Sequence, residues 1–214
     1  MAKKSVKKTI KKKVSKKVVA KKPNLFCEMY KDSFDLLRDS KKYIYSVIGI
    51  FFFFVLIGFF VPIPEEYSRK LLLYFKQLVE QTKDYGAWKM TTFLFQNNVW
   101  ASFIGFISGV FFGIFPLFNT ISNGFVLGFA AKISVAENGI FSLWRLLPHG
   151  IFELPALFIS LGMGIKLGVV TLFSRDWKKI TAYFTKSFRT FMIVVVPLLV
   201  VAAIIEGLLI VLSK

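Results

Sequence analysis

The chain has 214 residues, of which 55% are hydrophobic and 17% aromatic, and its formal net charge is +17. The mean hydropathy of +0.60 is typical of proteins with several membrane spans and rare among soluble globular domains, so a large soluble domain is excluded. The single cysteine, Cys27, excludes an internal disulfide and a multi-cysteine metal site.

The N-terminal tail, residues 1–23, is lysine-rich and of low complexity, and it is predicted to be disordered because it has little to bury. Residues 1–42 carry fifteen basic side chains against four acidic ones, which supplies +11 of the net charge. Beside a membrane, such a segment binds anionic lipid headgroups and stays cytoplasmic. No aromatic residue lies among the lysines before Phe26, so a specific nucleic-acid reader is not expected.

Residues 24–42 are predicted to form a juxtamembrane amphipathic helix, because apolar side chains recur there at helical spacing. The first span follows over Tyr43–Val61, nineteen residues without a charge, which is the length of one crossing. Pro62 and Pro64 end it.

The next segment, Glu65–Gly86, is predicted to be a second amphipathic helix, with an apolar face that includes Leu71, Leu72 and Phe75. We expect it to lie at the outer membrane interface or to cap the bundle, where it could meet an extracytoplasmic partner. Trp88, Phe93 and Phe95 are then expected to be interfacial anchors in front of the second span.

Four further spans are predicted, over residues 98–118, 119–136, 148–173 and 191–212. The second and third leave only Pro116–Thr120 to turn the chain and would form a tight antiparallel hairpin. The loop Ser174–Arg189 is basic and falls on the same side as the N-terminal tail, so that side is inside. The predicted fold is an all-α, polytopic cell-membrane protein with residues 43–214 as one domain of about five transmembrane helices, N-terminus cytoplasmic and C-terminus outside.

Three of these spans carry stripes of small residues, which allow helix backbones to approach closely. The stripes are Gly105, Gly109 and Gly113, extended by Asn98 and Ser102; Thr120, Gly124, Gly128 and Ala131, with Asn123 beside them; and Ala156, Ser160, Gly164 and Gly168. The second, third and fourth spans are therefore expected to form a tight core, although the same stripes could serve a homo-oligomer.

Polar residues of four spans are predicted to converge just below the outer surface, because His149 and Glu153 continue the stripe of the fourth span. This predicted polar cluster consists of His149, Glu153, Lys132, Glu206, Asn97 and Asn98. Lys132 would pair with Glu153 or Glu206, while Lys166 lies nearer the inner face, where a lysine can snorkel. We assign no catalytic residue, metal or cofactor, since two ligands one helical turn apart cannot hold a catalytic zinc.

Two stretches resemble the stage II sporulation protein M (SpoIIM) family of integral membrane proteins: NNVWASFIGFISGVFFGIFPLFNTISNGFVLGF and PHGIFELPALFISLGMGIKLG. The resemblance covers about Tyr43 to Leu212 and rests on the asparagine before a glycine-striped span, on Asn123, Gly124 and Gly128, and on the PHG-xx-EL-x-A stretch. It implies a multi-span helical protein not known as an enzyme, from a family whose best-studied members anchor a membrane complex with cell-wall-degrading partners. Many relatives occur in organisms that do not sporulate.

Three functions are compatible with these features. The favoured one is a non-enzymatic membrane scaffold of the SpoIIM type that anchors a membrane or envelope complex. In this function the polar cluster is structural and holds the spans together by hydrogen bonds. The second is a transporter, channel or lipid-handling protein that uses the same cluster. The third is an intramembrane enzyme built on His149 and Glu153, which would need ligands from other spans.

Overall fold

The computed structural model describes the backbone of residues 25–174 and 176–212, and the side chains of residues 27–143, 150–174 and 176–209. Every regular element within these ranges is a helix, as predicted. The long helices are α1 (Leu25–Phe60), α2 (Glu65–Thr82), α3 (Ala87–Ile107), α4 (Ile114–Asn138), α5 (Leu147–Phe173), α6 (Trp177–Thr190) and α7 (Val196–Leu212). Short helical segments are η1 (Ser108–Val110), η2 (Ile140–Leu146) and η3 (Phe191–Val195). The lysine-rich tail lies outside the described residues.

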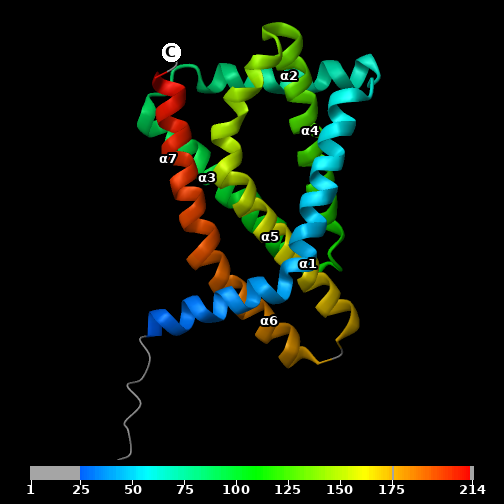
Figure 1. Ribbon diagram of the computed structural model, residues 1–214, viewed down its shortest axis with the longest axis vertical. Coiled ribbons are helices and arrows are strands. Elements are labelled where there is room, and N and C mark those ends of the chain that lie inside the picture. The colour runs from blue at the N-terminus through cyan, green and yellow to red at the C-terminus, as the bar shows by residue number, and fades with distance from the viewer. Residues whose placement is uncertain (1–24, 175, 213–214) are drawn as a thin grey trace, which may run out of the picture.

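The molecule is elongated, with helices running lengthwise between two capped ends (Figure 1). We name the end formed by α2 and η2 the α2 end, and the end formed by α6 and the first part of α1 the basic end. Among the described residues, four helices are long and apolar enough to cross a membrane: 27–60, 114–138, 150–173 and 177–209. This number of spans is close to the predicted count of about five. The helix α3 also runs lengthwise, from the α2 end toward the basic end (Figure 1).

The predicted juxtamembrane helix and first span are a single helix, α1, of 36 residues. Its first part lies across the basic end and its second part runs lengthwise (Figure 1). No proline or glycine separates the two parts, so the backbone hydrogen bonding continues between them. Ser46 donates its hydroxyl to the Lys42 carbonyl at 2.9 Å, an arrangement that bends helices without ending them.

The second span begins and ends earlier than predicted, because α3 starts at Ala87 and the chain turns over residues 108–113 instead of Pro116–Thr120. Phe112 and Gly113 have φ of +59° and +73°, a left-handed conformation that reverses the chain. Pro116 then falls in the first turn of α4, where its missing N–H leaves no helical hydrogen bond unmade.

The last two helices, α6 and α7, are joined through the π-helical turn η3. Pro197 lacks an N–H and cannot bond to the residue four positions before it, while the Val196 N–H bonds to the Phe191 carbonyl five positions back. The basic segment Ser174–Arg189 is therefore mostly an ordered helix that leads directly into the last span.

The core is centred on α5. One buried cluster joins it to α3, α6 and α7, where Phe106 and Phe191 stack with ring centroids 6.1 Å apart. A second cluster joins α5 to α1, where Phe51 and Phe158 pack edge to face at 5.0 Å. Burying such rings stabilises a fold by about 1 kcal/mol per aromatic pair beyond the area they bury.

Candidate functional site: helix contacts and polar clusters

The stripe Gly105, Gly109 and Gly113 lies against α5. A Cβ added to Gly105 would lie 2.7 Å from the Leu161 side chain, and one on Gly109 would collide with the Gly164 backbone. Gly113 belongs to the turn, where it faces Ile165 and Gly168. Gly109, which meets backbone, and Gly113, which has a positive φ, therefore need glycine for close contact between α5 and the α3–η1 segment, whereas Gly105 meets only the end of a leucine side chain.

The stripe on α4 lies against α1, and not within the predicted core of spans two to four. A Cβ on Gly124 would collide with the Phe51 carbonyl, and one on Gly128 with the Val55 carbonyl. From the α1 side, Gly58 makes an equally close approach to the backbone at Phe125. These glycines thus mediate the contacts of α3 with α5 and of α4 with α1. Gly162 of α5 and Gly207 of α7 likewise come close to Ile44 of α1 and Thr91 of α3.

Asn123 is placed differently from the glycines around it. It is exposed, and its amide donates within α4 to the Asn119 carbonyl at 2.9 Å and to the Asn119 side chain at 2.6 Å. The structure therefore puts Asn123 outside the α4–α1 contact that Gly124 and Gly128 make.

Two members of the predicted polar cluster are buried: Asn98 on α3 and Glu206 on α7, with exposures of 8% and 6%. Asn97 is exposed and donates its amide to the Asn98 side chain at 3.3 Å. Because α3 begins at Ala87, both asparagines lie in the middle of that helix, about 16 Å from its start and not at its outer end.

The other members lie on α4 and α5. Lys132 and Glu153 are half-buried, and both lie in the halves of their helices nearer the α2 end. His149 belongs to the first turns of α5, but its side chain lies outside the described residues. The pairing of Lys132 with Glu153 or Glu206 stays a prediction, as does the convergence of the cluster.

A second polar cluster, missed by the sequence analysis, lies toward the basic end. The Lys166 ammonium of α5 pairs with the Asp39 carboxylate of α1 and lies 5.0 Å from the ring centroid of Tyr183 on α6. The Lys166 side chain is 10% exposed, whereas that of Asp39 is 76% exposed. Lys166 is therefore held inside the protein with its charge directed toward a carboxylate at the surface.

Tyr183 extends this inner cluster, which we define as Asp39, Ser40, Lys166 and Tyr183. Its hydroxyl lies 3.4 Å from the Ser40 hydroxyl and 3.4 Å from the Met163 carbonyl. One small group of side chains thus ties together α1, α5 and α6. The only sequence signal for it was a lysine within a small-residue helix, and nothing in the sequence named Asp39 as its partner.

A buried hydrogen bond joins α5 to α3 between the two polar regions. The Ser160 hydroxyl donates to the Ser102 carbonyl at 2.5 Å, and both residues are almost completely buried. Among the described side chains, no group of three or more His, Cys, Asp or Glu could hold a metal ion.

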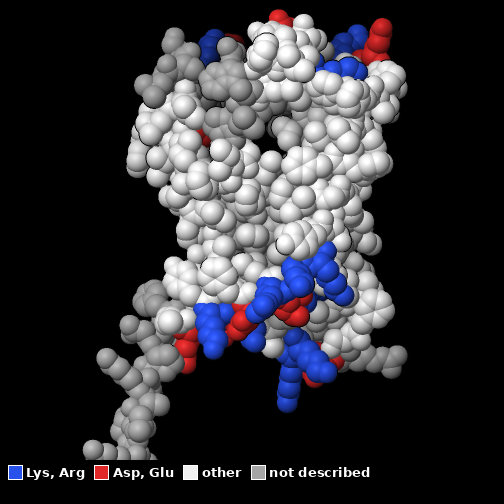
Figure 2. Space-filling model, in the orientation of Figure 1, with Lys and Arg blue, Asp and Glu red and all other residues white. Residues whose placement is uncertain are grey.

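Two grooves lie on the surface of the bundle. One, of about 550 Å³, runs along α6 and includes the basic side chains Lys178, Lys186 and Arg189. The other, of about 520 Å³, lies between α1, α2 and α4 and is lined largely by apolar side chains such as Phe54, together with Lys70. On the face shown in Figure 2, charged side chains gather at the two ends of the molecule, and the surface between them is almost free of charge.

A helical bundle with charged ends, an apolar middle and glycine-mediated contacts between helices defines a polytopic membrane protein. The chain belongs to the SpoIIM family, since the family model described as stage II sporulation protein M matches residues 47–209. The resemblance on Asn123, Gly124, Gly128 and the PHG stretch correctly identified the family.

Two relatives come from the archaeon Methanocaldococcus jannaschii. One, described as uncharacterized protein MJ0793, is 35% identical over 115 residues, which is 51% of this chain and 65% of the relative. The other, uncharacterized protein MJ0706, is 30% identical over 119 residues, or 53% of this chain and 52% of the relative. The chain thus spans between half and two thirds of these relatives. No solved structure matches it.

Proposed function

We propose that this protein is a non-enzymatic membrane scaffold that anchors a membrane or envelope complex through the outward surface of α2. The observation that carries the proposal is the placement of α2, which lies across one end of the bundle (Figure 1) and has no buried residue. The role that the family resemblance implies, anchoring other proteins at a membrane, needs a surface of this kind.

The two sides of α2 have different surroundings. Its half-buried apolar residues include Leu71 and Phe75, and the Phe75 ring stacks on Phe129 of α4 at 6.4 Å. Leu73 and Tyr74 are 53% and 57% exposed, on the same helix. A helix that is fastened to the bundle by one side and exposes a leucine and a tyrosine on another is suited to docking a protein.

Site-specific photocrosslinking tests this proposal. A photoreactive amino acid at Leu73 should yield a discrete protein adduct in native membranes, whereas one at Leu56, a leucine of similar exposure (55%) on the membrane-spanning part of α1, should not. The adduct should disappear when Tyr74 is changed to serine. A crosslinking pattern at Leu73 identical to that at Leu56 would contradict the docking role of α2.

A second function, lipid handling, is favoured by the groove between α1, α2 and α4. This groove has the apolar lining that an acyl chain requires, and two of its lining residues, Lys70 and Tyr67, come from α2, where a phosphate headgroup would lie. A phosphate there would compete with Glu66, which pairs with Lys70 at 2.6 Å. Ile121→Trp would fill the groove from α4. If the protein moves lipids, liposomes that contain it should scramble fluorescent phospholipid faster than empty liposomes, and liposomes with the variant should scramble it more slowly than those with the unchanged protein. Equal rates in these three kinds of liposome would exclude lipid scrambling and favour the scaffold function.

A further inference from the structure

The turn between α3 and α4 has an unusual surface for a loop that leaves a membrane. No charged residue occurs between Lys89 and Lys132, so the turn and the parts of α3 and α4 that lead to it, residues 90–131, are uncharged. Phe111, Phe112 and Ile114 at the turn are 61%, 54% and 63% exposed. Loops that emerge into water are usually polar, because exposed apolar side chains of this size have no partner there.

The uncharged parts of the two arms that lead to this turn are short. From Lys89 to the end of α3 at Ile107, and from Ile114 to Lys132 on α4, the helical rise is about 27 Å in each case at 1.5 Å per residue. The hydrocarbon core of a bilayer is about 30 Å thick. With the charged residues held at one surface, the turn reaches the far boundary of the core without passing through the opposite headgroups.

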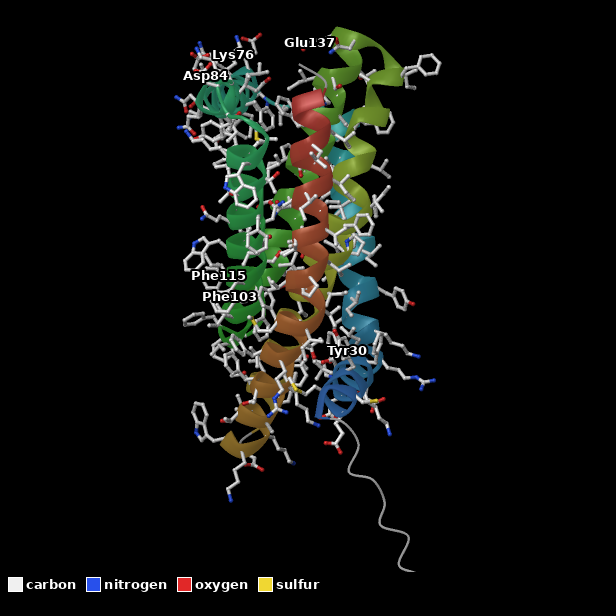
Figure 3. All side chains as sticks on the ribbon, turned by 90° about the vertical axis from the view of Figure 1, so that its left-hand side faces the viewer. Tyr30, Lys76, Asp84, Phe103, Phe115 and Glu137 are labelled. Carbon is white, nitrogen blue, oxygen red and sulfur yellow. The ribbon has the colours of Figure 1, made fainter. Side chains whose placement is uncertain are left out.

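The neighbouring helix extends beyond the turn. Gly113 packs on Ile165 and Gly168, but α5 continues for five residues past Gly168 to Phe173, about 8 Å farther toward the basic end. Figure 3 shows Phe115, just after the turn, projecting sideways from the molecule at a level between the two ends, farther from the basic end than Tyr30. The turn is therefore recessed relative to α5, α6 and the first part of α1.

The backbone of the turn is compatible with a membrane environment. Polar backbone groups at membrane depth are tolerated when they bond internally or are covered by protein. The N–H groups of Phe111 and Gly113 donate to the carbonyls of Ser108 and Gly109, both at 3.0 Å, and that of Ile114 donates to Phe111 at 3.3 Å. On its other side the turn is covered by α5 at Gly168, which leaves the phenylalanine side chains facing outward.

The backbone conformation of Phe112 also favours an apolar environment for the turn. Its φ of +59° is a backbone geometry that glycine or asparagine adopts at lower cost, and both are common in turns that face water. A bulky apolar side chain at such a position is explained when its contact with an apolar surrounding offsets the strain.

We propose that α3 and α4 form a re-entrant hairpin whose phenylalanine-rich tip, residues 108–115, stays in the acyl-chain region of the leaflet at the basic end. Lipid surrounds the tip, because the tip continues the exposed apolar surfaces of α3 and α4 without a charge between them. On α3, for example, Trp100 and Ile104 are 65% and 44% exposed. The hairpin enters and leaves at the α2 end, so the sides predicted for the two termini are unchanged. The proposal depends on the membrane location alone and not on a scaffold role.

Cysteine accessibility tests the proposal in the full chain. Cys27, the single native cysteine, is first changed to serine, and then Phe112→Cys or Phe115→Cys is compared with Lys179→Cys on the exposed side of α6. In open membrane fragments, where both faces are accessible, a charged maleimide should label position 179 and fail to label either tip position, because the reactive thiolate does not form among acyl chains. After the membranes are dissolved in detergent, the same reagent should label all three positions. Two tip positions are used because Phe112→Cys alters a strained residue; labelling of Phe115→Cys by the charged reagent as fast as position 179 would overturn the proposal.

A second readout separates lipid from a covering protein. A bimane fluorophore at position 115 in liposomes should be quenched by spin-labelled acyl chains, whereas one at position 179 should be quenched by a water-soluble agent. A tip fluorophore shielded from both quenchers would mean that a second copy of the chain covers the tip, which would also overturn the proposal.

Discussion

At the scale of single residues, the pair of Lys166 and Asp39 shows how a charge is accommodated next to a membrane. A buried ammonium is costly unless a counter-ion or an aromatic face compensates for its lost hydration. Lys166 has both, because the Asp39 carboxylate and the Tyr183 ring converge on it from α1 and α6. The free-energy cost of desolvation falls mainly on Lys166, because the Asp39 side chain stays 76% exposed.

This asymmetry predicts unequal effects of the two neutral substitutions. Asp39→Asn should lower the free energy of unfolding by about 1–2 kcal/mol, because it leaves the Lys166 charge without its carboxylate; the exposure of Asp39 keeps the loss below that of a fully buried pair. Lys166→Met should cost less, and the double variant should recover most of the loss. Thermal unfolding in detergent measures the stability of the three variants. Equal losses of stability in both single variants would contradict the conclusion that the cost of desolvation falls mainly on Lys166.

At the scale of helices, glycine decides which pairs come into backbone contact. A Cβ on Gly164 would lie 2.6 Å from the Gly105 carbonyl and 3.0 Å from Pro116, so a side chain there meets backbone that cannot move easily. Gly49 on α1 is exposed, and a Cβ added there would have no neighbouring atom within 4 Å. The same residue type therefore has opposite consequences at two places in the fold.

We therefore expect Gly164→Ala to destabilise the protein by about 1–3 kcal/mol through overpacking. Gly49→Ala, the matched control, should stabilise it by about 0.5–1 kcal/mol, since alanine loses less backbone entropy in a helix. Gly128→Ala should behave like Gly164→Ala, because it separates α4 from α1. The midpoints of thermal unfolding compare the three, and a neutral Gly128→Ala would argue against the α4–α1 contact.

At the scale of the whole molecule, charge is segregated along the long axis. The first part of α1 and α6 bring their basic residues to the same end, and α2 carries a separate charged surface at the other (Figures 1 and 2). Cationic segments are retained on the cytoplasmic side during membrane insertion. This arrangement supports the predicted orientation, in which the basic end is cytoplasmic.

Labelling of intact cells tests this orientation. In a chain with Cys27→Ser, Lys179→Cys on exposed α6 should be protected from an impermeant maleimide until the cells are opened, and Val79→Cys on α2, which is 67% exposed, should react without opening. The reverse pattern would invert the topology, and the phenylalanine-rich tip would then lie in the outer leaflet.

Much of the helical content was predictable, because length and lack of charge are local properties of a segment. The apolar run of α1, the amphipathic pattern of α2 and the small faces of α3, α4 and α5 can be seen in the sequence. Helix limits were harder to predict, since mid-helix asparagines such as Asn98 resemble a helix start, and a proline such as Pro116 fits a first helical turn as well as a loop.

The sequence by itself determined that the chain is a multi-span helical membrane protein of the SpoIIM family, because composition, periodicity and family motifs lie along the chain. The tertiary structure alone decided which surfaces meet. A glycine stripe shows that a helix packs closely but not against which neighbour, so the α4–α1 pair could not be inferred from Gly124 and Gly128. Likewise, Lys166 and Asp39 are 127 residues apart, and only the folded bundle brings their opposite charges together.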